Sequence, residues 1–396
     1  DIGGTSADVA VIVDGQVAQG NGEIIGDFPI YIPSVAVTSV GQGGGSLAWI
    51  DNQGVLQMGP DSAGSLPGPV CFQRGGTQPT ATDAFAACGM IGHGNLGYNA
   101  VKVDVAAARA AWQPLAERLG ITVEETAETA IELAISSMYG DTSGLLSRFG
   151  LDPREFWFLA FGGAGPMMGC FLARELNMKG VIVPPTPGVL SALGGLVADI
   201  RNDFSRTLYS DLDAMLADSL ATEADALSQR ARHWLREQHG THMPFTLHYS
   251  ADMRYRGQSF EIEVALEPEW LTQANVSALH AAFDRQHQQL FGHFDASAPV
   301  QIINLRLVIA SPTPKPTLNT LATASAPVEV SKQVSAWIDG ASHQVDVVPR
   351  ASLLAGHHLF GPVIIAQDDC TTCVPPGMQV DVDTFGNLLI TPVEAN

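Results

Sequence analysis

Residues 1–15 read DIGGTSADVAVIVDG, in which an acidic residue and two glycines precede an alternating apolar run. The Asp-Gly pair that ends the run is a strong signal for the turn of a β-hairpin. Gly3 and Gly4 let backbone N–H groups converge on one point, and the next two residues, Thr5 and Ser6, add hydroxyl donors. The stretch therefore predicts an anion-binding loop between two strands. The alternative is a plain tight turn with a capping acid.

Acidic side chains stand beside this loop. A carboxylate next to a bound phosphate is repulsive unless a divalent cation bridges the two groups, so Asp1 predicts a Mg²⁺ site. Asp8 is a second acid close to the same loop. A Walker loop is excluded, because that motif joins a strand to a helix and carries a Gly-Lys-Ser/Thr ending that this stretch lacks.

Two further segments are rich in glycine. Residues 41–46, GQGGGS, enter a strand, and such a loop permits very close approach by a ligand or by another backbone. Residues 161–166, FGGAGP, lie between a continuous apolar strand and a helix. Amides at a helix N-terminus suit phosphates, and glycines suit a flat base or a ribose. Simple close packing of the strand on the helix is the alternative for this segment.

The long Gly/Pro-rich segment of residues 59–85 holds two charged candidates. Arg74 is the only cation in residues 1–101, and a lone guanidinium among glycines is a candidate anion clamp. Asp83 lies near the end of the segment and is expected to be the N-cap of the following helix. Because long ordered loops in compact domains are usually functional, both residues remain site candidates.

The pattern of elements predicts an α/β fold. Short strands dominate residues 1–100, and helices dominate residues 103–148, where TVEE at 122–125 has the spacing of a capping box. Residues 156–183 read strand, glycine turn, helix and strand, which indicates a βαβ-like unit. Residues 188–204 are expected to form a helix of small residues.

The sequence pattern changes near residue 206 and again at a Pro-rich segment, which predicts three domains. Residues 1–205 form the first. Residues 206–311 mix amphipathic helices with alternating strands and predict an α+β extension. Residues 312–327 are rich in Pro, Thr and Ala and predict a linker or a surface excursion. Residues 328–396 contain short strands and turns and predict a β-rich C-terminal domain.

The composition limits the partners and the setting. A net charge of -21, spread over 396 residues, argues against nucleic acid and anionic membranes, because both need basic patches. No apolar run approaches the roughly 18 residues that span a bilayer. The 5 cysteines form no disulfide framework, and the C-x-x-C at 370–373 lacks the second pair that a zinc site needs. A reduced, cytoplasmic setting is expected.

Taken together, these stretches resemble one family. The D-x-G-G-T-S-x-D-V loop, GQGGGSLAWID at 41–51, the segment at 59–83 and AFGGAGP at 160–166 are similar to the hydantoinase A/5-oxoprolinase family. That family is related to the acetone and acetophenone carboxylase subunits. MRYRGQSFEIEV at 253–264 and PVIIAQDDCTTCVPPG at 362–377 continue the resemblance through the chain.

The resemblance implies half of an actin/sugar-kinase/Hsp70-like ATPase fold for residues 1–205. In that fold, two related α/β halves clamp Mg-ATP between them. The implied contacts are Gly3, Gly4, Thr5 and Ser6 at the phosphates, Gly162, Gly163, Ala164 and Gly165 at the adenosine, and Asp1 at Mg²⁺. The family has an earlier half with its own D-x-G-G-T loop, so the resemblance implies that this chain lacks the N-terminal half. These 396 residues alone are expected to bind ATP poorly.

The activity implied by the resemblance is ATP-dependent hydrolysis of a small cyclic amide. Transfer of the γ-phosphate to the amide carbonyl oxygen creates a good leaving group, and water then opens the ring. Asp8, Arg74 and Asp83 are the candidates for orienting the substrate or transferring the phosphate. A B-type hydantoinase subunit is the implied partner. Two alternatives stay open, namely an ATP-dependent ketone carboxylase subunit and a non-catalytic structural subunit.

Overall fold

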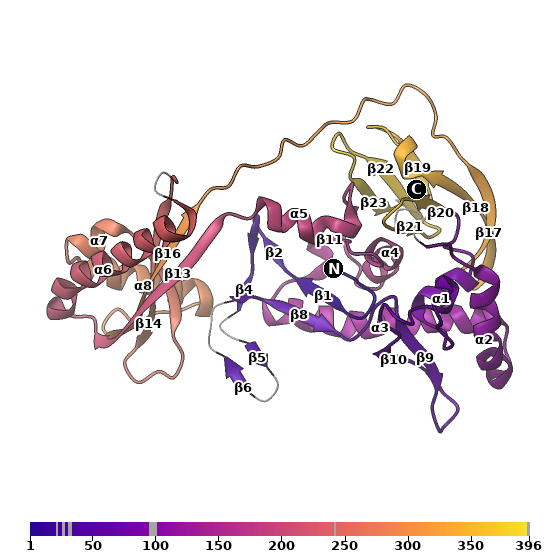
Figure 1. Ribbon diagram of the computed structural model, residues 1–396. Helices are drawn as coiled ribbons and strands as arrows, with labels where there is room; N and C mark the ends of the chain where they lie inside the picture. The colour runs from indigo at the N-terminus through magenta and orange to yellow at the C-terminus, as the bar shows by residue number, and fades with distance from the viewer. Residues whose placement is uncertain (21–22, 26–27, 31–33, 95–100, 241–242, 394–396) are drawn as a thin grey trace. The chain divides into compact units, whose positions relative to one another are not determined.

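The computed structural model describes residues 1–20, 23–25, 28–30, 34–94, 101–240 and 243–393 (Figure 1). The chain divides into two compact units. One contains Asp1–Leu193 and Thr317–Asn396, and the other contains Gly194–Pro316. Helices and mixed sheets occur in the described residues, which confirms the predicted α/β class. The predicted C-terminal domain, residues 328–396, falls within the first of these units.

The N-terminal stretch of the first unit forms strands joined by tight turns. β1 (Ala7–Ala10) pairs antiparallel with β8 (Val37–Val40), and β2 (Ile12–Val13) pairs with β3 (Gln16–Val17). Asp14 and Gly15 have φ values of 50° and 75°, the left-handed geometry of a two-residue hairpin turn. The short strands described between β3 and β8 are β4 (Gln19–Gly20), β5 (Glu23–Ile25), β6 (Phe28–Ile30) and β7 (Ser34–Val35).

A second hairpin and three helices follow. β9 (Ser46–Ile50) pairs antiparallel with β10 (Leu56–Ser62), and a single 3-10 turn, Val70–Phe72, precedes α1 (Ala81–Ala87). α2 (Val105–Leu119) ends at Gly120, whose φ of 75° suits a C-cap. α3 (Val123–Arg148) begins with the predicted capping box of Thr122 and Glu125, and this prediction is confirmed.

The C-terminal strands complete a sheet that the βαβ unit begins. β11 (Trp157–Leu159), α4 (Gly165–Glu175) and β12 (Gly180–Val183) form the predicted unit, with β11 and β12 parallel. The five-stranded sheet has the order β11-β12-β23-β22-β19 and includes β19 (His358–Phe360), β22 (Met378–Val382) and β23 (Leu388–Pro392). A four-stranded sheet has the order β17-β18-β20-β21 and contains β17 (Lys332–Ile338), β18 (Ala341–Pro349), β20 (Val363–Ala366) and β21 (Thr371–Val374).

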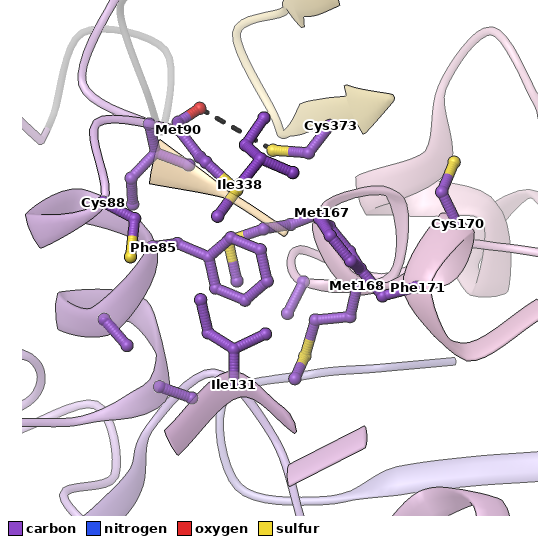
Figure 2. Packing of buried hydrophobic residues seen from close by; sticks show 14 of the residues in the cluster. Phe85, Cys88, Met90, Ile131, Met167, Met168, Cys170, Phe171, Ile338 and Cys373 are labelled. Atoms are coloured by element: carbon purple, nitrogen blue, oxygen red, sulfur yellow. Dashed lines mark hydrogen bonds between the residues drawn. The ribbon is translucent and has the colours of Figure 1, made fainter. Parts of the chain in front are cut away.

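Apolar side chains from helices and strands of the first unit meet in one core. Figure 2 shows Phe85 of α1, Ile131 of α3, Met167, Met168 and Phe171 of α4, and Ile338 of β17. The rings of Phe85 and Phe171 meet edge to face, with centroids 5.8 Å apart. The Cys373 thiol donates to the carbonyl oxygen of Met90 at 3.6 Å, which ties β21 to the segment after α1 (Figure 2). Because close-packed interiors deform little, residues anchored in this core have fixed positions.

The segment that leads into the second unit corrects one prediction. A helix was expected over residues 188–204, but α5 (Leu190–Val197) is shorter, and β13 (Ile200–Asp211) begins soon after it. The reason is strand pairing, because β13 pairs antiparallel with β16 (Val300–Ser311) from Ile200 onward. Ladder hydrogen bonds along a long strand outweigh the helical preference of a few residues.

The second unit is an antiparallel sheet with one apolar and one polar face. Its strand order is β13-β16-β14-β15, with β14 (Thr246–Tyr255) and β15 (Ile262–Leu266). The helices are α6 (Ala214–His239), α7 (Pro268–Thr272) and α8 (Val276–Phe291), and both α6 and α8 contact the sheet. Met253 and Leu307 belong to the buried core of this unit. On the other face, Asp252 accepts hydrogen bonds from Arg306 Nη2 at 2.8 Å and from Asn304 at 2.7 Å.

Candidate functional site

The GGG run that enters β9 lies directly against the N-terminal glycine loop. The amide of Gly44 donates to the carbonyl of Gly3 at 3.0 Å, and the amide of Gly45 donates to the carbonyl of Gly4 at 2.6 Å. A Cβ built on Gly43 would lie 2.8 Å from the Gly3 carbonyl oxygen, and one on Gly45 would lie 2.8 Å from that of Gly4. Glycine is therefore needed because one backbone approaches another, which is one of the two alternatives that the sequence left open here.

The segment before α4 contacts the same loop. The amide of Ile2 donates to the carbonyl of Phe161, and the amide of Ala164 donates to the carbonyl of Ile2, both at 2.9 Å. Gly162 has a φ of 84°, and a Cβ built on it would lie 2.3 Å from Asp1 Oδ1. The loop expected to hold phosphates and the segment expected to hold adenosine are therefore adjacent, although they lie far apart in the sequence.

A pocket of about 460 Å³ opens where these segments meet. Its glycine and alanine lining consists of Gly3, Gly4, Gly44, Gly45, Gly64, Gly163 and Ala164, and its polar lining consists of Thr5, Ser65, Arg74, Thr82, Asp369 and Thr371. Among the residues predicted from sequence, Gly3, Gly4, Thr5, Arg74, Gly163 and Ala164 line this pocket. Ser6, Gly162 and Gly165 belong to the same loops but are not part of the lining.

Three features of the pocket suit an anionic ligand. A Cβ built on Gly4 or on Gly163 meets no atom within 4 Å, so space lies above both glycines. Within the described residues, the amides of Gly4 and Thr5 donate to no protein acceptor. Backbone N–H groups need partners, and convergent free amides attract anions. Arg74 is exposed at the same pocket and forms no ion pair with any described residue.

An apolar wall completes the pocket, and sequence reasoning missed it. The wall consists of Pro69, Phe72, Ile91, Val101 and Met167. Met167 is anchored in the core and is only 5% exposed. In the sequence these residues are indistinguishable from ordinary core positions, because nothing local shows that they share one cavity. A wall of this kind binds hydrocarbon parts of a small molecule.

Two acidic candidates lie beside the pocket without lining it. Asp1 Oδ2 accepts a hydrogen bond from the Ser191 hydroxyl at 2.8 Å. Asp8 is exposed on β1 and accepts a hydrogen bond from the Ser39 hydroxyl of the paired strand β8. Asp1 is the first residue of the glycine loop and lies against Gly162 of the segment before α4, whereas Asp8 extends from the strand that follows the loop.

Asp83 occupies a different position from the one expected. The N-cap of α1 is Thr80, and Asp83 is the third residue of the helix, so the prediction that Asp83 is the N-cap is wrong. Its side chain returns a hydrogen bond to the Thr80 amide, which closes a capping box. Asp83 is fully buried and does not line the pocket, while its neighbour Thr82 does.

Asp369 and Thr371 also line the pocket, and no local pattern in the sequence predicts that they do. The amide of Gly188 donates to Asp369 Oδ2 at 2.9 Å, so the acid is tied to the turn before α5. In the sequence, residues 370–373 stand out only as a C-x-x-C pair, and the pattern does not single out the acid before them. Asp369 lies at the pocket because the fold packs β21, which follows it, next to α4.

The cysteines play no visible part in the pocket lining. All five thiols are free and buried. Burial raises the pKa of the Cys170 thiol to about 12 and raises the pKa of Cys71, Cys88, Cys370 and Cys373 as well. Among the residues that the structure describes, no cluster of three His, Cys, Asp or Glu side chains is arranged to hold a metal. The described helices include none with the length and the hydropathy of a membrane span.

Comparison with known proteins decides the family. The family model described as hydantoinase/oxoprolinase matches residues 1–204, and the model of the hydantoinase/oxoprolinase C-terminal domain matches residues 209–390. The chain belongs to the hydantoinase/oxoprolinase family. The resemblance inferred from the glycine loops is thereby confirmed over nearly the whole chain.

Relatives in the hydantoinase/oxoprolinase family include enzymes that are named for different substrates. Caprolactamase subunit alpha of Pseudomonas jessenii is 32% identical over 408 residues, which cover 99% of this chain and 58% of the relative. The 5-oxoprolinase 1 of Arabidopsis thaliana is 28% identical over 98% of this chain and 32% of its own length. This chain therefore spans little more than half of the first relative and less of the second.

Two solved structures share the fold of this hydantoinase/oxoprolinase chain. The crystal structure of ATP-dependent caprolactamase from Pseudomonas jessenii has a TM-score of 0.81 at 31% identity. The nucleotide-free structure of acetone carboxylase has a TM-score of 0.84 at 25% identity. Each match covers 99% of this chain and 58% of the solved chain.

Proposed function

We propose that this chain is part of an ATP-dependent hydrolase that phosphorylates the carbonyl oxygen of a cyclic amide. The observation that carries the proposal is the meeting of the loop at residues 1–6 with the segment at 161–165 on one pocket. Free amides, open space above two glycines and an apolar wall occur together there. Relatives with a matching fold are named as ATP-dependent enzymes, which supports ATP as the phosphate donor.

The glycine loop supplies the proposed phosphate contacts. Gly4 and Thr5 offer amides, Thr5 and Ser6 offer hydroxyls, and Gly3, whose own amide donates to the carbonyl of Ser6 at 3.0 Å, lets the phosphates approach the backbone closely. The segment of Gly162, Gly163, Ala164 and Gly165 supports the adenosine. Anion binding by convergent amides requires no basic side chain in the loop itself. Arg74 then provides the one cation of this part of the chain, on the pocket wall.

Mg²⁺ is proposed to bind at Asp1. Mg²⁺ in phosphate sites takes one or two carboxylates, keeps several waters and uses substrate phosphates as ligands. One carboxylate beside the loop fits that requirement, and the described residues hold no metal cluster that is complete without phosphate. When bound, Mg²⁺ neutralises charge on the phosphates.

The reaction divides one difficult hydrolysis into easier steps. The amide carbonyl oxygen attacks the γ-phosphorus, the bond to the bridging oxygen breaks, ADP leaves, and the amide nitrogen loses its proton to solvent. Water then adds to the activated carbon, the ring nitrogen departs as an amine, and hydrolysis of the acyl phosphate releases phosphate. In this chain, the wall with Phe72 and Met167 holds the hydrocarbon part of the ring, and Arg74 orients an oxygen or a phosphoryl group. Asp8 remains a candidate for orienting the substrate.

A second candidate is an ATP-dependent ketone carboxylase subunit. The acetone carboxylase structure has the higher TM-score of the two structures described above, which is the observation in its favour. Both candidates transfer phosphate to an oxygen atom and use the same pocket. A non-catalytic structural subunit is the third alternative. Because the name caprolactamase subunit alpha marks a multi-subunit enzyme, we propose a B-type partner subunit and a cytoplasmic complex for this protein.

ATP turnover by the full-length protein with its partner subunit tests the proposal. Hydantoin, 5-oxoproline, a lactam, and a ketone with bicarbonate are supplied separately, and we expect turnover with a cyclic amide. Turnover with the ketone and bicarbonate alone would establish the carboxylase instead. Asp1→Asn is expected to abolish turnover, whereas the matched control Asp14→Asn, at a turn that tolerates Asn, retains it. Unchanged turnover in Asp1→Asn would support the structural alternative.

A further inference from the structure

α1 and α3 begin with the same capping box, and comparison of the two reveals an additional role for Asp83. In α3, Glu125 Oε2 accepts from the Thr122 amide at 2.9 Å and from its hydroxyl at 2.7 Å. In α1, Asp83 Oδ2 accepts from the Thr80 amide at 2.9 Å and from its hydroxyl at 2.8 Å. Both boxes satisfy orphan donors at a helix start. Up to this point the two acids are equivalent.

Asp83 makes two further contacts that Glu125 lacks. Its Oδ1 accepts from the amide of Cys71 at 2.7 Å, and its Oδ2 accepts from the amide of Val70 at 3.0 Å. Asp83 is fully buried, whereas Glu125 is exposed. A buried carboxylate is costly unless several donors compensate for its lost hydration. The cost of burying Asp83 is offset by these four donors, so the loop amides are part of what keeps the charge inside.

The loop that Asp83 holds forms one wall of the pocket. Val70 and Cys71 lie between Pro69 and Phe72, which line the pocket, and Arg74 lines it two residues later. The 3-10 turn Val70–Phe72 is too short to hold itself in place, because its hydrogen bonds are few. Two groups from outside the turn hold it: Asp83 accepts from the amides of Val70 and Cys71, and the amide of Asp104 donates to the carbonyl of Cys71 at 2.8 Å.

The same turn of α1 also reaches the glycine loop. The amide of Thr82 donates to the carbonyl of Gly44 at 2.8 Å, and the amide of Gly44 donates to the carbonyl of Gly3 at 3.0 Å. One helical turn thus ties the wall that carries Phe72 and Arg74 to the loop that we assign to phosphate binding. Adjacent residues make the two contacts, since Thr82 lines the pocket and binds Gly44, whereas the buried Asp83 binds the amides of Val70 and Cys71.

We propose that Asp83 is a positioning residue that fixes the distance between the substrate wall and the phosphate loop. It does not touch substrate, and it acts through the amides of Val70 and Cys71. The expected effect on cyclic-amide binding rests on the proposed function, whereas the expected effect on the order of residues 69–76 does not. Loss of the anchor loosens residues 69–76 and weakens binding of the cyclic amide, while the ATP loop remains held by Gly44.

Two matched substitutions in the full-length protein with its partner subunit test this inference. Asp83→Asn removes the charge and one pair of acceptor sites, and Glu125→Gln makes the same change in the box without loop contacts. Amide hydrogen exchange at residues 69–76 is expected to rise about tenfold in Asp83→Asn only. The KM for the cyclic amide is expected to rise about tenfold, with the KM for ATP unchanged. A purely structural role would lower the active fraction and leave both KM values as they are.

Several outcomes would overturn the inference. They are unchanged exchange at residues 69–76 in Asp83→Asn, an equal increase in Glu125→Gln, or a cyclic-amide KM that does not move. If Asp83→Asn does not fold, Asp83→Glu keeps the charge on a side chain one methylene longer, and a smaller shift in the same two measurements is expected. Wild-type values in Asp83→Glu would then contradict the inference. If no cyclic amide is turned over at all, the exchange result still decides the positioning role, while the proposed function fails separately.

Discussion

The α-carbon of Gly162 lies so close to the carboxylate of Asp1 that a Cβ built on the glycine would be 2.3 Å from Oδ1. The contact joins the turn before α4 to the first residue of the glycine loop. Gly162 also has a φ of 84°, a conformation that side chains disfavour. Both the lack of space and the backbone conformation therefore require glycine at position 162, where the two predicted parts of the nucleotide site meet.

Gly162→Ala is expected to lower the free energy of unfolding by about 3 kcal/mol, because strain at positive φ adds to overpacking. Denaturant titration measures the loss. The control is Gly163→Ala, where a Cβ meets no atom within 4 Å, and its stability should stay within about 0.5 kcal/mol of wild type. Equal stability of the two variants would mean that the loops do not approach as described.

Gly44→Ala should destabilise the fold through its contact with α1. A Cβ at Gly44 would lie 2.8 Å from Thr82 Oγ1. Because shortening the threonine relieves the overlap, Thr82→Ala is expected to recover about 1 kcal/mol of the loss in the double variant. A double-mutant cycle of unfolding free energies measures this coupling. Strict additivity of the two substitutions would contradict the packing.

Arg74→Ala is expected to lower kcat/KM about tenfold to a hundredfold, since a charge-assisted hydrogen bond to an anion is lost. Stability should change by less than about 0.5 kcal/mol, because the side chain is exposed and forms no ion pair with a described residue. Steady-state kinetics of the full-length protein provide the test. Arg118→Ala is the control, because this exposed arginine makes a single side-chain hydrogen bond among the described residues, to the carbonyl of Asp51 at 3.3 Å. Equal effects in both variants would argue against an anion clamp.

The thiols should be unreactive in the folded protein. All five cysteines are buried, and burial raises the thiol pKa, so little thiolate is present at neutral pH. A thiol-specific disulfide reagent should therefore label none quickly under native conditions and all five after unfolding in guanidinium. Rapid labelling of one thiol in the folded state would show that its surroundings are open.

Asp252→Ala should destabilise the second unit by about 3 kcal/mol, because it leaves the half-buried Arg306 without its paired carboxylate. The comparison is Asp203→Ala, whose partner Arg201 is exposed, and where less than about 1 kcal/mol is expected. Thermal unfolding followed by calorimetry distinguishes the two. A loss of similar size at Asp203 would contradict the assignment of Asp252 to a partly buried network.

Local patterns predicted much of the fold. The Asp14-Gly15 turn, the Thr122 and Glu125 capping box and the βαβ unit depend on neighbours in sequence, and the structure confirms each of them. The glycine loop at residues 1–6 is also a local pattern, and its role in phosphate binding stays a prediction. What remained hidden depends on contacts between distant segments. Asp369 approaches the pocket only because β21 packs near α4, and no local spacing encodes that contact.

The wrong prediction that Asp83 is the N-cap of α1 has a physical explanation of its own. Both Thr80 and Asp83 are good capping residues, and in a capping box the cap and the third residue exchange hydrogen bonds. Sequence alone indicated that an acid belongs at the start of α1. It did not indicate that the carboxylate also accepts from the amides of Val70 and Cys71, because those residues are brought there by the fold.

Amide hydrogen exchange of the full-length protein, with and without saturating Mg-ATP, tests whether the glycine loops form the nucleotide site. Gly4 and Thr5 donate to no acceptor among the described residues, so their amides exchange freely until a phosphate engages them. The proposed site predicts slower exchange in residues 1–6 and 161–165 when Mg-ATP is bound. Tight Mg-ATP binding that leaves exchange in both segments unchanged would place the nucleotide elsewhere and contradict the proposal.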